Sequence, residues 1–195
     1  TGQKLSMANP LNANEIRACR DAGIDLFVCG MDQIDDVREI APTHFCRVGS
    51  KWAQFDSNEE LMADAFEAMR RGADMYYTLR SLDAVEKMTR EGIPVQSHIG
   101  LIPTFSQYCG GLRGWGRKAD EAIKIYENLK RMEDVGVVAV TTSLTVDASP
   151  AKGSFNGNGS SSITTCPVSF FMLSCCADCL AFTCWFISFA LSTMF

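Results

Sequence analysis

The sequence predicts an α/β fold: a partial (β/α)8 barrel of the TIM type, with about six parallel βα units and an atypical apolar C-terminal tail. Short apolar runs alternate with segments whose apolar residues recur at helical spacing, a pattern typical of parallel strands joined by right-handed helical crossovers. The 195-residue chain can bury a sizeable core but is shorter than the ~250 residues typical of a complete barrel. After Val146 the alternation stops.

The strands are predicted from apolar runs of the kind found where both faces of a strand are buried. Residues 24–29 (IDLFVC) are the clearest such run. The expected strands are residues 4–8, 24–29, 43–48, 75–79, 93–99 and 137–144.

The helices are predicted from caps and from apolar residues at helical spacing. Asn residues precede the first helix and Gly23 ends it, Asp56 to Glu59 open a stronger one, and Ser81 caps the next. The expected helices are residues 15–22, 32–40, 59–71, 82–90 and 118–135.

The C-terminal segment does not resemble the two βα units that a barrel still needs. We divide the chain into an incomplete barrel (1–146), a Gly- and Ser-rich linker (147–167) and a mainly apolar tail (168–195) with one charge, Asp178. The length and hydropathy of the tail allow a membrane helix. Its abrupt onset and lack of flanking Lys or Arg favour sequence not selected for this fold, such as a frame-shifted end. We expect the tail to be poorly ordered, or an apolar helix that does not complete the barrel.

Composition and the first residues bear on the binding partners and the cellular location of the protein. The net charge of -5, with acidic and basic residues interspersed, gives no basic stripe for a nucleic acid backbone. The start at Thr1 lacks the pattern of a secretory signal and is typical of a fragment boundary. Four of the nine cysteines are scattered singly, as reduced core thiols are. We expect a cytoplasmic protein, with a mitochondrial or membrane-anchored location as the alternative. A membrane partner follows only if the tail is genuine.

The most informative stretch is residues 91–117, EGIPVQSHIGLIPTFSQYCGGLRGWGR, followed by a helix that ends in Glu133-Asp134-Val135-Gly136. Together they resemble ketopantoate hydroxymethyltransferase, over residues 4–143. The resemblance implies a barrel related to phosphoenolpyruvate mutase and isocitrate lyase, and a role in pantothenate biosynthesis. It also implies transfer of a hydroxymethyl unit from methylenetetrahydrofolate to a small 2-keto acid through an enolate. Mg or another divalent metal and a homo-oligomer are implied as well.

The resemblance also locates the family's functional positions, and most of them differ here. The family has an Asp after each of the second and third strands, a Lys on the fourth, a His on the fifth and a Glu at the end of the sixth. In this chain these positions are Met31 with Asp32 adjacent, Gly49, Tyr77, His98, and a residue on or near Ser143. The usual two-Asp metal site therefore cannot form, and one neighbouring carboxylate supplies a single ligand.

His98 is the candidate catalytic residue, as a polar contact to the keto or carboxylate group; the alternative is a hydrogen-bonded core histidine. Strand alternation predicts that its side chain points into the barrel mouth, near Asp32 and the glycine-rich loop 110–116, interpreted as a lid. Asp32 is the candidate metal ligand, with a loop cap as the alternative. Ser97, Arg113 and Arg117 are candidate substrate-binding residues, the arginines through bidentate contacts or else as solvated loop charges.

Three hypotheses about function stay open. The first is a divergent or truncated hydroxymethyltransferase-like enzyme. The second is a non-catalytic barrel fragment that serves as a binding or oligomerisation module. The third is a carbon-carbon lyase or mutase of the same superfamily.

His44, at the start of its strand, is interpreted as structural.

Overall fold

A computed structural model describes residues 3–50, 54–100, 107–108, 110–111, 114–143, 172–175 and 185–189. Six strands alternate with helices in the order that the sequence predicts. The strands are β1 (Gln3–Ala8), β2 (Leu26–Cys29), β3 (Phe45–Gly49), β4 (Met75–Tyr77), β5 (Val95–Gly100) and β6 (Ala139–Ser143). The helices are α1 (Ala13–Asp21), a 3-10 turn η1 (Met31–Gln33), α2 (Ile34–Ile40), α3 (Asn58–Arg70), α4 (Leu82–Arg90) and α5 (Ala119–Asp134).

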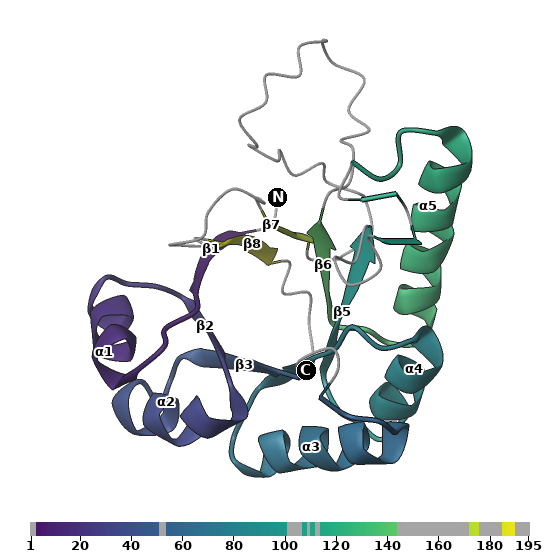
Figure 1. The fold of residues 1–195 in the computed structure, drawn as a ribbon. Coiled ribbons are helices and arrows are strands. Elements are labelled where there is room, and N and C mark those ends of the chain that lie inside the picture. The colour runs from purple at the N-terminus through teal and green to yellow at the C-terminus, as the bar shows by residue number, and fades with distance from the viewer. Residues whose placement is uncertain are drawn as a thin grey trace, which may run out of the picture.

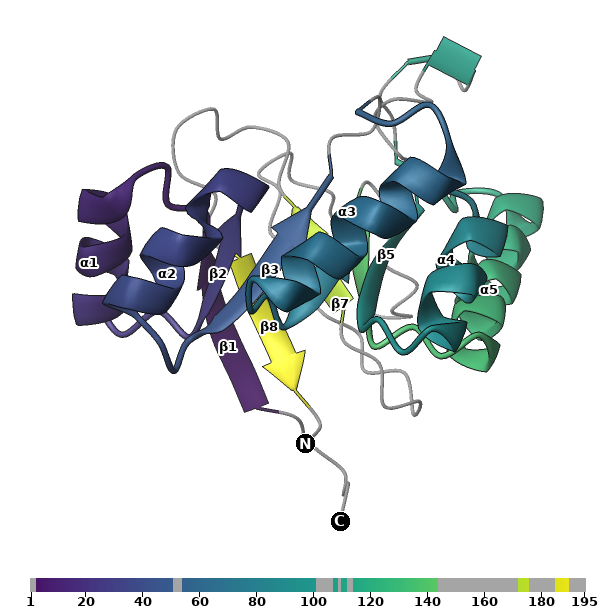
Figure 2. The ribbon, with the colours of Figure 1, turned by 90° about the horizontal axis from the view of Figure 1, so that it is seen from below.

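The six strands pair in parallel and in sequence order, so each helix is a crossover between neighbouring strands. Seen down the barrel axis, they form a curled half-barrel with the helices on its outside (Figure 1). In Figure 2, which is seen from below Figure 1, α2 and α3 lie in front of the strands. The predicted partial (β/α)8 architecture is confirmed.

Local sequence explains where the helices begin and end. The Asn12 side chain accepts hydrogen bonds from the backbone N–H groups of Asn14 and Glu15 at the start of α1. Ser57 and Glu60 form a capping box at the start of α3. Gly136 follows α5 with a φ of 82°, a left-handed conformation that glycine adopts without strain. The chain therefore turns sharply into β6.

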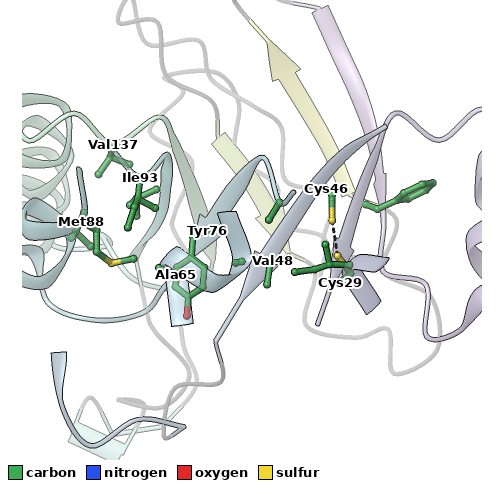
Figure 3. Packing of buried hydrophobic residues seen from close by; sticks show 14 of the residues in the cluster. Cys29, Cys46, Val48, Ala65, Tyr76, Met88, Ile93 and Val137 are labelled. Carbon is green, nitrogen blue, oxygen red and sulfur yellow. Dashed lines mark hydrogen bonds between the residues drawn. The ribbon is translucent and has the colours of Figure 1, made fainter. Parts of the chain in front are cut away.

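The convex face of the sheet carries the main core. Strand residues that point outward pack against the helices; they include Phe27, Cys46, Val48, Tyr76 and Val95. The Cys29 and Cys46 thiols lie 2.8 Å apart there, and both belong to this core (Figure 3). Tyr76 reaches from β4 to α3, where its hydroxyl donates to the Asp64 carboxylate at 2.5 Å. This layer holds the outward-facing residues of β2 to β6.

The concave face carries the alternate strand residues. Near the amino ends of the strands they form a second apolar cluster that contains Met7, Leu26, Met75 and Ala139. On β3, β4 and β6 the next residues on this face are polar: Arg47 follows Phe45, Tyr77 follows Met75 and Thr141 follows Ala139. Since alternate residues of a strand point to opposite faces, the barrel interior changes from apolar to polar toward the carboxyl ends.

Two short segments of the tail are strands of the same sheet. β7 (Met172–Cys175) is parallel to β6, and β8 (Trp185–Phe189) is antiparallel to β1. β7 and β8 are also in contact with each other. These nine residues are therefore not helical, and an antiparallel β8 departs from the parallel order of a complete (β/α)8 barrel. The linker and the rest of the tail lie outside the described residues, so the division of the chain stays a prediction. Within the part of the chain that is described, no helix is both long and apolar enough to cross a membrane.

Candidate functional site

His98 lies near the carboxyl end of β5, the end at which barrel enzymes assemble their sites. The burial of β5 on both faces positions it: Val95 and Ile99 pack into the convex core, while Gln96 and His98 face the concave side. His98 is 9% exposed. The predicted orientation into the barrel interior agrees with these contacts.

Tyr77, on the neighbouring strand β4, is the hydrogen-bond partner of His98. The Tyr77 hydroxyl lies 2.9 Å from His98 Nδ1, and the two rings meet edge to face with centroids 6.4 Å apart. A phenol O–H is a stronger acid than a neutral imidazole N–H, so we assign Tyr77 as the donor and Nδ1 as the acceptor. This assignment places the imidazole proton on Nε2.

The surroundings keep His98 uncharged. Burial, and then the positive charge of Arg47, lower the pKa of His98 to about 4. Both effects disfavour the imidazolium ion. At neutral pH the side chain is therefore a neutral imidazole that can donate a hydrogen bond through one nitrogen while accepting one through the other.

Arg47 on β3 joins this group from the other side of Tyr77. Its guanidinium carbon lies 4.4 Å from the centroid of the Tyr77 ring, a cation-π contact. Its Nη1 donates to Gln96 Oε1 at 3.0 Å, and Gln96 Nε2 donates to Thr141 Oγ1 at 2.8 Å. Four adjacent strands thus contribute to one group, the interior polar cluster: Arg47, Tyr77, Gln96, His98 and Thr141.

Among the residues that the structure describes, no carboxylate balances the charge on Arg47. In the part of the chain that the structure describes, its side chain donates to the neutral Gln96 and pairs with no Asp or Glu. Its Nε is enclosed and has no hydrogen-bond partner. Burial lowers the pKa of Arg47 to about 10, so the guanidinium still carries its charge at neutral pH. An unpaired cation of this kind creates a positive potential inside the barrel.

The residues at the family's metal positions do not fit a divalent ion. A Cβ added at Gly49 would lie 3.0 Å from Tyr77 Cδ1 and 3.1 Å from its Cβ, so Tyr77 occupies the space of a side chain there. Met31 packs against the convex core. Asp32 is exposed on η1, with its Oδ1 folded back over Gly30. Among the described residues, no three His, Cys, Asp or Glu side chains are grouped to hold a metal ion.

The structure describes the surroundings of some of the other sequence-predicted residues, whose roles stay predictions. Ser97 is buried and, being adjacent to His98 on the strand, points to the convex side. Arg117 is exposed just before α5. Arg113 lies outside the described residues. Of the glycine-rich loop, the Gly116 N–H donates to the buried carboxylate of Glu121 at 3.0 Å, which ties the end of the loop to the first turn of α5. His44 stacks on Phe27 with ring centroids 5.0 Å apart.

Sequence reasoning singled out His98 and named Tyr77 only as the position of the family's lysine; it did not single out Arg47, Gln96 or Thr141, the other members of the interior polar cluster. Arg47 is a single polar residue in an apolar strand, and Gln96 is followed directly by Ser97 and His98, so neither was singled out. The available signal was alternation: Phe45, Arg47 and Gly49 form the set opposite to Cys46 and Val48. A cation in the set that faces away from the helices of a barrel has to point into its interior.

Comparison with known proteins identifies relatives of this chain. The family model for ketopantoate hydroxymethyltransferase matches residues 51–152, just over half of the chain. A 3-methyl-2-oxobutanoate hydroxymethyltransferase from Lysinibacillus sphaericus is 34% identical over 88 residues, covering 44% of this chain and 32% of that protein. The enzyme of the same name from Shewanella sediminis is 29% identical over 159 residues, covering 69% and 60%. The chain thus spans less than two thirds of the length of either relative.

Solved structures agree on the fold. A protein from Burkholderia cenocepacia J2315 assigned as a phosphonomutase superposes with a TM-score of 0.55 at 11% identity, covering 72% of this chain and 69% of that one. A second protein from the same organism, assigned as a lyase/mutase, gives 0.53 at 11% identity, covering 73% and 61%. At this identity the likeness concerns architecture alone.

Proposed function

This chain belongs to the ketopantoate hydroxymethyltransferase family, and we propose that it binds a small 2-keto acid at the interior polar cluster and transfers a hydroxymethyl unit to it through an enolate. The observation that carries the proposal is the neutral His98, hydrogen-bonded to Tyr77 beside the buried positive charge of Arg47. Methylenetetrahydrofolate would supply the one-carbon unit, by analogy with the family.

The cluster suits the charge that develops in such a reaction. When a base from the solvent, such as hydroxide, takes the proton from the carbon beside a keto group, negative charge develops on the keto oxygen. A preorganised donor and a fixed cation in an enclosed site stabilise that charge without reorganisation. In this proposal the neutral imidazole of His98 donates to the keto oxygen, as neutral histidines do in other enolising enzymes. Tyr77 fixes its tautomer and ring orientation.

A direct test follows the carbon acid itself. The full chain is incubated with 3-methyl-2-oxobutanoate in D2O, and proton NMR measures loss of the C3 hydrogen signal, which needs no one-carbon donor. We expect exchange above the rate without protein, and a roughly 100-fold reduction in His98→Ala, the scale of a lost hydrogen-bond donor to a developing oxyanion.

The matched control is His44→Ala, which removes the other histidine of the chain, at the start of β3 and stacked on Phe27. The control is expected to keep its exchange rate, and circular dichroism checks that both variants are folded. Exchange that is absent, or equal in His98→Ala and the native chain, would overturn the enolising role.

One observation favours a second candidate function, binding of the keto acid without transfer. None of the concave-face residues of β1 to β6 is an Asp or Glu, and a neutral imidazole whose pKa is about 4 is a weak base at neutral pH. A protein that binds 3-methyl-2-oxobutanoate but neither exchanges its C3 hydrogen nor yields a hydroxymethylated product would be a binding module.

A further inference from the structure

We propose that Arg47 takes the place of a divalent metal in this site: its guanidinium binds the carboxylate of a small 2-keto acid, and the protein needs no metal ion to hold that ligand. The inference rests on the proposed function for the identity of the ligand. It departs from the metal dependence that the family resemblance implies.

The first argument is charge. The Arg47 guanidinium lies over the Tyr77 ring and donates to the neutral amide of Gln96. In the described part of the chain its charge pairs with no carboxylate. Burying an unpaired ion is expensive, and the loss is recovered when an anion arrives. A guanidinium presents five donors in a plane, of which Arg47 gives one to Gln96. The planar fork fits a carboxylate.

The second argument is position. Arg47 is two residues before Gly49 on the same face of β3, and Gly49 is the position where the family has a metal-binding Asp. Tyr77 fills the space beside Gly49, and its ring makes the cation-π contact with Arg47. β3 therefore lacks the family's metal-binding carboxylate at Gly49 but has a positive charge two residues earlier, at Arg47. A divalent ion at the same place would be repelled by this guanidinium.

The third argument is the neighbour. His98 is joined to Tyr77, and the Arg47 charge acts on its imidazole. A 2-keto acid has a carboxylate and a carbonyl on adjacent carbons. Its carboxylate can meet the guanidinium while its keto oxygen meets the imidazole, so the cluster suits a 2-keto acid better than a simple carboxylate.

The test is isothermal calorimetry of the full chain with 3-methyl-2-oxobutanoate, in EDTA and again in excess MgCl2. We expect equal affinity in both buffers. Arg47→Met should weaken binding roughly 10- to 100-fold, the value of a charge-assisted hydrogen bond. Arg90→Met removes the same charge from an exposed ion pair with Glu86 at the end of α4, and this control should bind as the native chain does.

A second variant separates loss of binding from loss of folding. In Gln96→Glu a carboxylate replaces the amide whose oxygen lies 3.0 Å from Arg47 Nη1. The Thr141 hydroxyl can rotate to donate to it. The internal ion pair should raise the melting temperature and at the same time weaken keto acid binding, because the guanidinium already has an anion.

The outcomes distinguish this inference from the proposed function. Binding that appears only with Mg overturns the inference and leaves the function standing. Acetate is titrated in the same way as a simple carboxylate. If acetate binds through Arg47 and the keto acid does not bind, the anion site is supported and the proposed function is contradicted. No binding of either ligand in either buffer overturns both. Equal losses in Arg47→Met and Arg90→Met, or unchanged binding in Gln96→Glu, also overturn the inference.

Discussion

Burial, and then the positive charge of Arg47, determine the protonation of His98. Tyr77 on β4 supplies the hydrogen bond at Nδ1, and Arg47 on β3 supplies the opposing charge. The result is a histidine whose neutral form is favoured by folding.

This preference makes the free energy of unfolding depend on pH. The folded pKa of His98 is about 4, against about 6.5 in the unfolded chain. Between these values the unfolded state binds the extra proton, so stability falls as the pH falls from about 6.5 to about 4. His98 alone should lower the free energy of unfolding by about 2 kcal/mol between pH 7 and pH 5.

Urea denaturation at the two pH values, on the native chain and on His98→Gln, measures this contribution. Glutamine keeps a hydrogen-bonding group but does not titrate, so the variant should lose about 2 kcal/mol less than the native chain over the same interval. An identical loss in both proteins would show that His98 titrates normally.

The contact between Gly49 and Tyr77 can be tested by a double-mutant cycle. A methyl group at Gly49 would press on Tyr77 at 3.0 to 3.1 Å, so Gly49→Ala should cost about 1 kcal/mol or more through overpacking. In a Tyr77→Ala background the same substitution should cost nothing or stabilise the chain. Equal costs in both backgrounds, measured by denaturant unfolding, would mean that Tyr77 does not fill the space of the missing side chain.

At the residue scale, sequence could predict His98 because it follows an apolar run and precedes a loop rich in glycine. It could not predict the pairing of His98 with Tyr77 or of Arg47 with Gln96. Those contacts depend on the register between strands, such as Tyr77 opposite Gln96 and His98 opposite Thr141, and register is a property of the folded sheet. Ser97 shows the converse: adjacency in sequence placed it on the opposite face.

Helix caps provide a prediction at the scale of single elements. Ser57 accepts from the Glu60 N–H at 3.1 Å, whereas Ser81 occupies the same position before α4 without a side-chain cap bond. Ser57→Ala should lower the free energy of unfolding by about 1 kcal/mol. Ser81→Ala is the matched control, and thermal unfolding should show little change. Similar shifts in both variants would contradict the difference between the two caps.

Element boundaries follow the sequence closely where a cap or an apolar run marks them. The helix expected at 59–71 is Asn58–Arg70, and that at 118–135 is Ala119–Asp134. The segment expected as one helix over 32–40 begins instead with the 3-10 turn Met31–Gln33, because the Gln33 side chain accepts from the Gly30 N–H at 2.8 Å. The strands β7 and β8 had no such markers, since their surroundings are apolar throughout.

At the scale of the whole molecule, the tail segments cover both edges of the half-barrel. β8 pairs with β1 from Gln3 to Met7, and β7 pairs with β6 from Val140 to Ser143. Uncovered edges present unpaired backbone groups and invite association between chains. In the part of the chain that the structure describes, α1 to α5 and the interior polar cluster all lie before residue 144.

Truncation after Val146 should therefore separate folding from association. We expect the helical circular dichroism per molecule to persist, because α1 to α5 remain, while size-exclusion chromatography shows larger species at micromolar concentration. Loss of the helical signal would mean that β7 and β8 are needed for folding. A monodisperse truncated chain would mean that they do not protect the edges.

The interior polar cluster as a keto acid site is tested most directly by NMR of the imidazole nitrogens. The chain has two histidines, so the spectrum holds a site signal from His98 and an internal reference from His44. Titration with 3-methyl-2-oxobutanoate in EDTA should shift the His98 resonances and leave those of His44 in place, and Arg47→Met should abolish the shift. Unmoved His98 resonances at saturating ligand, or equal shifts at both histidines, would contradict the account.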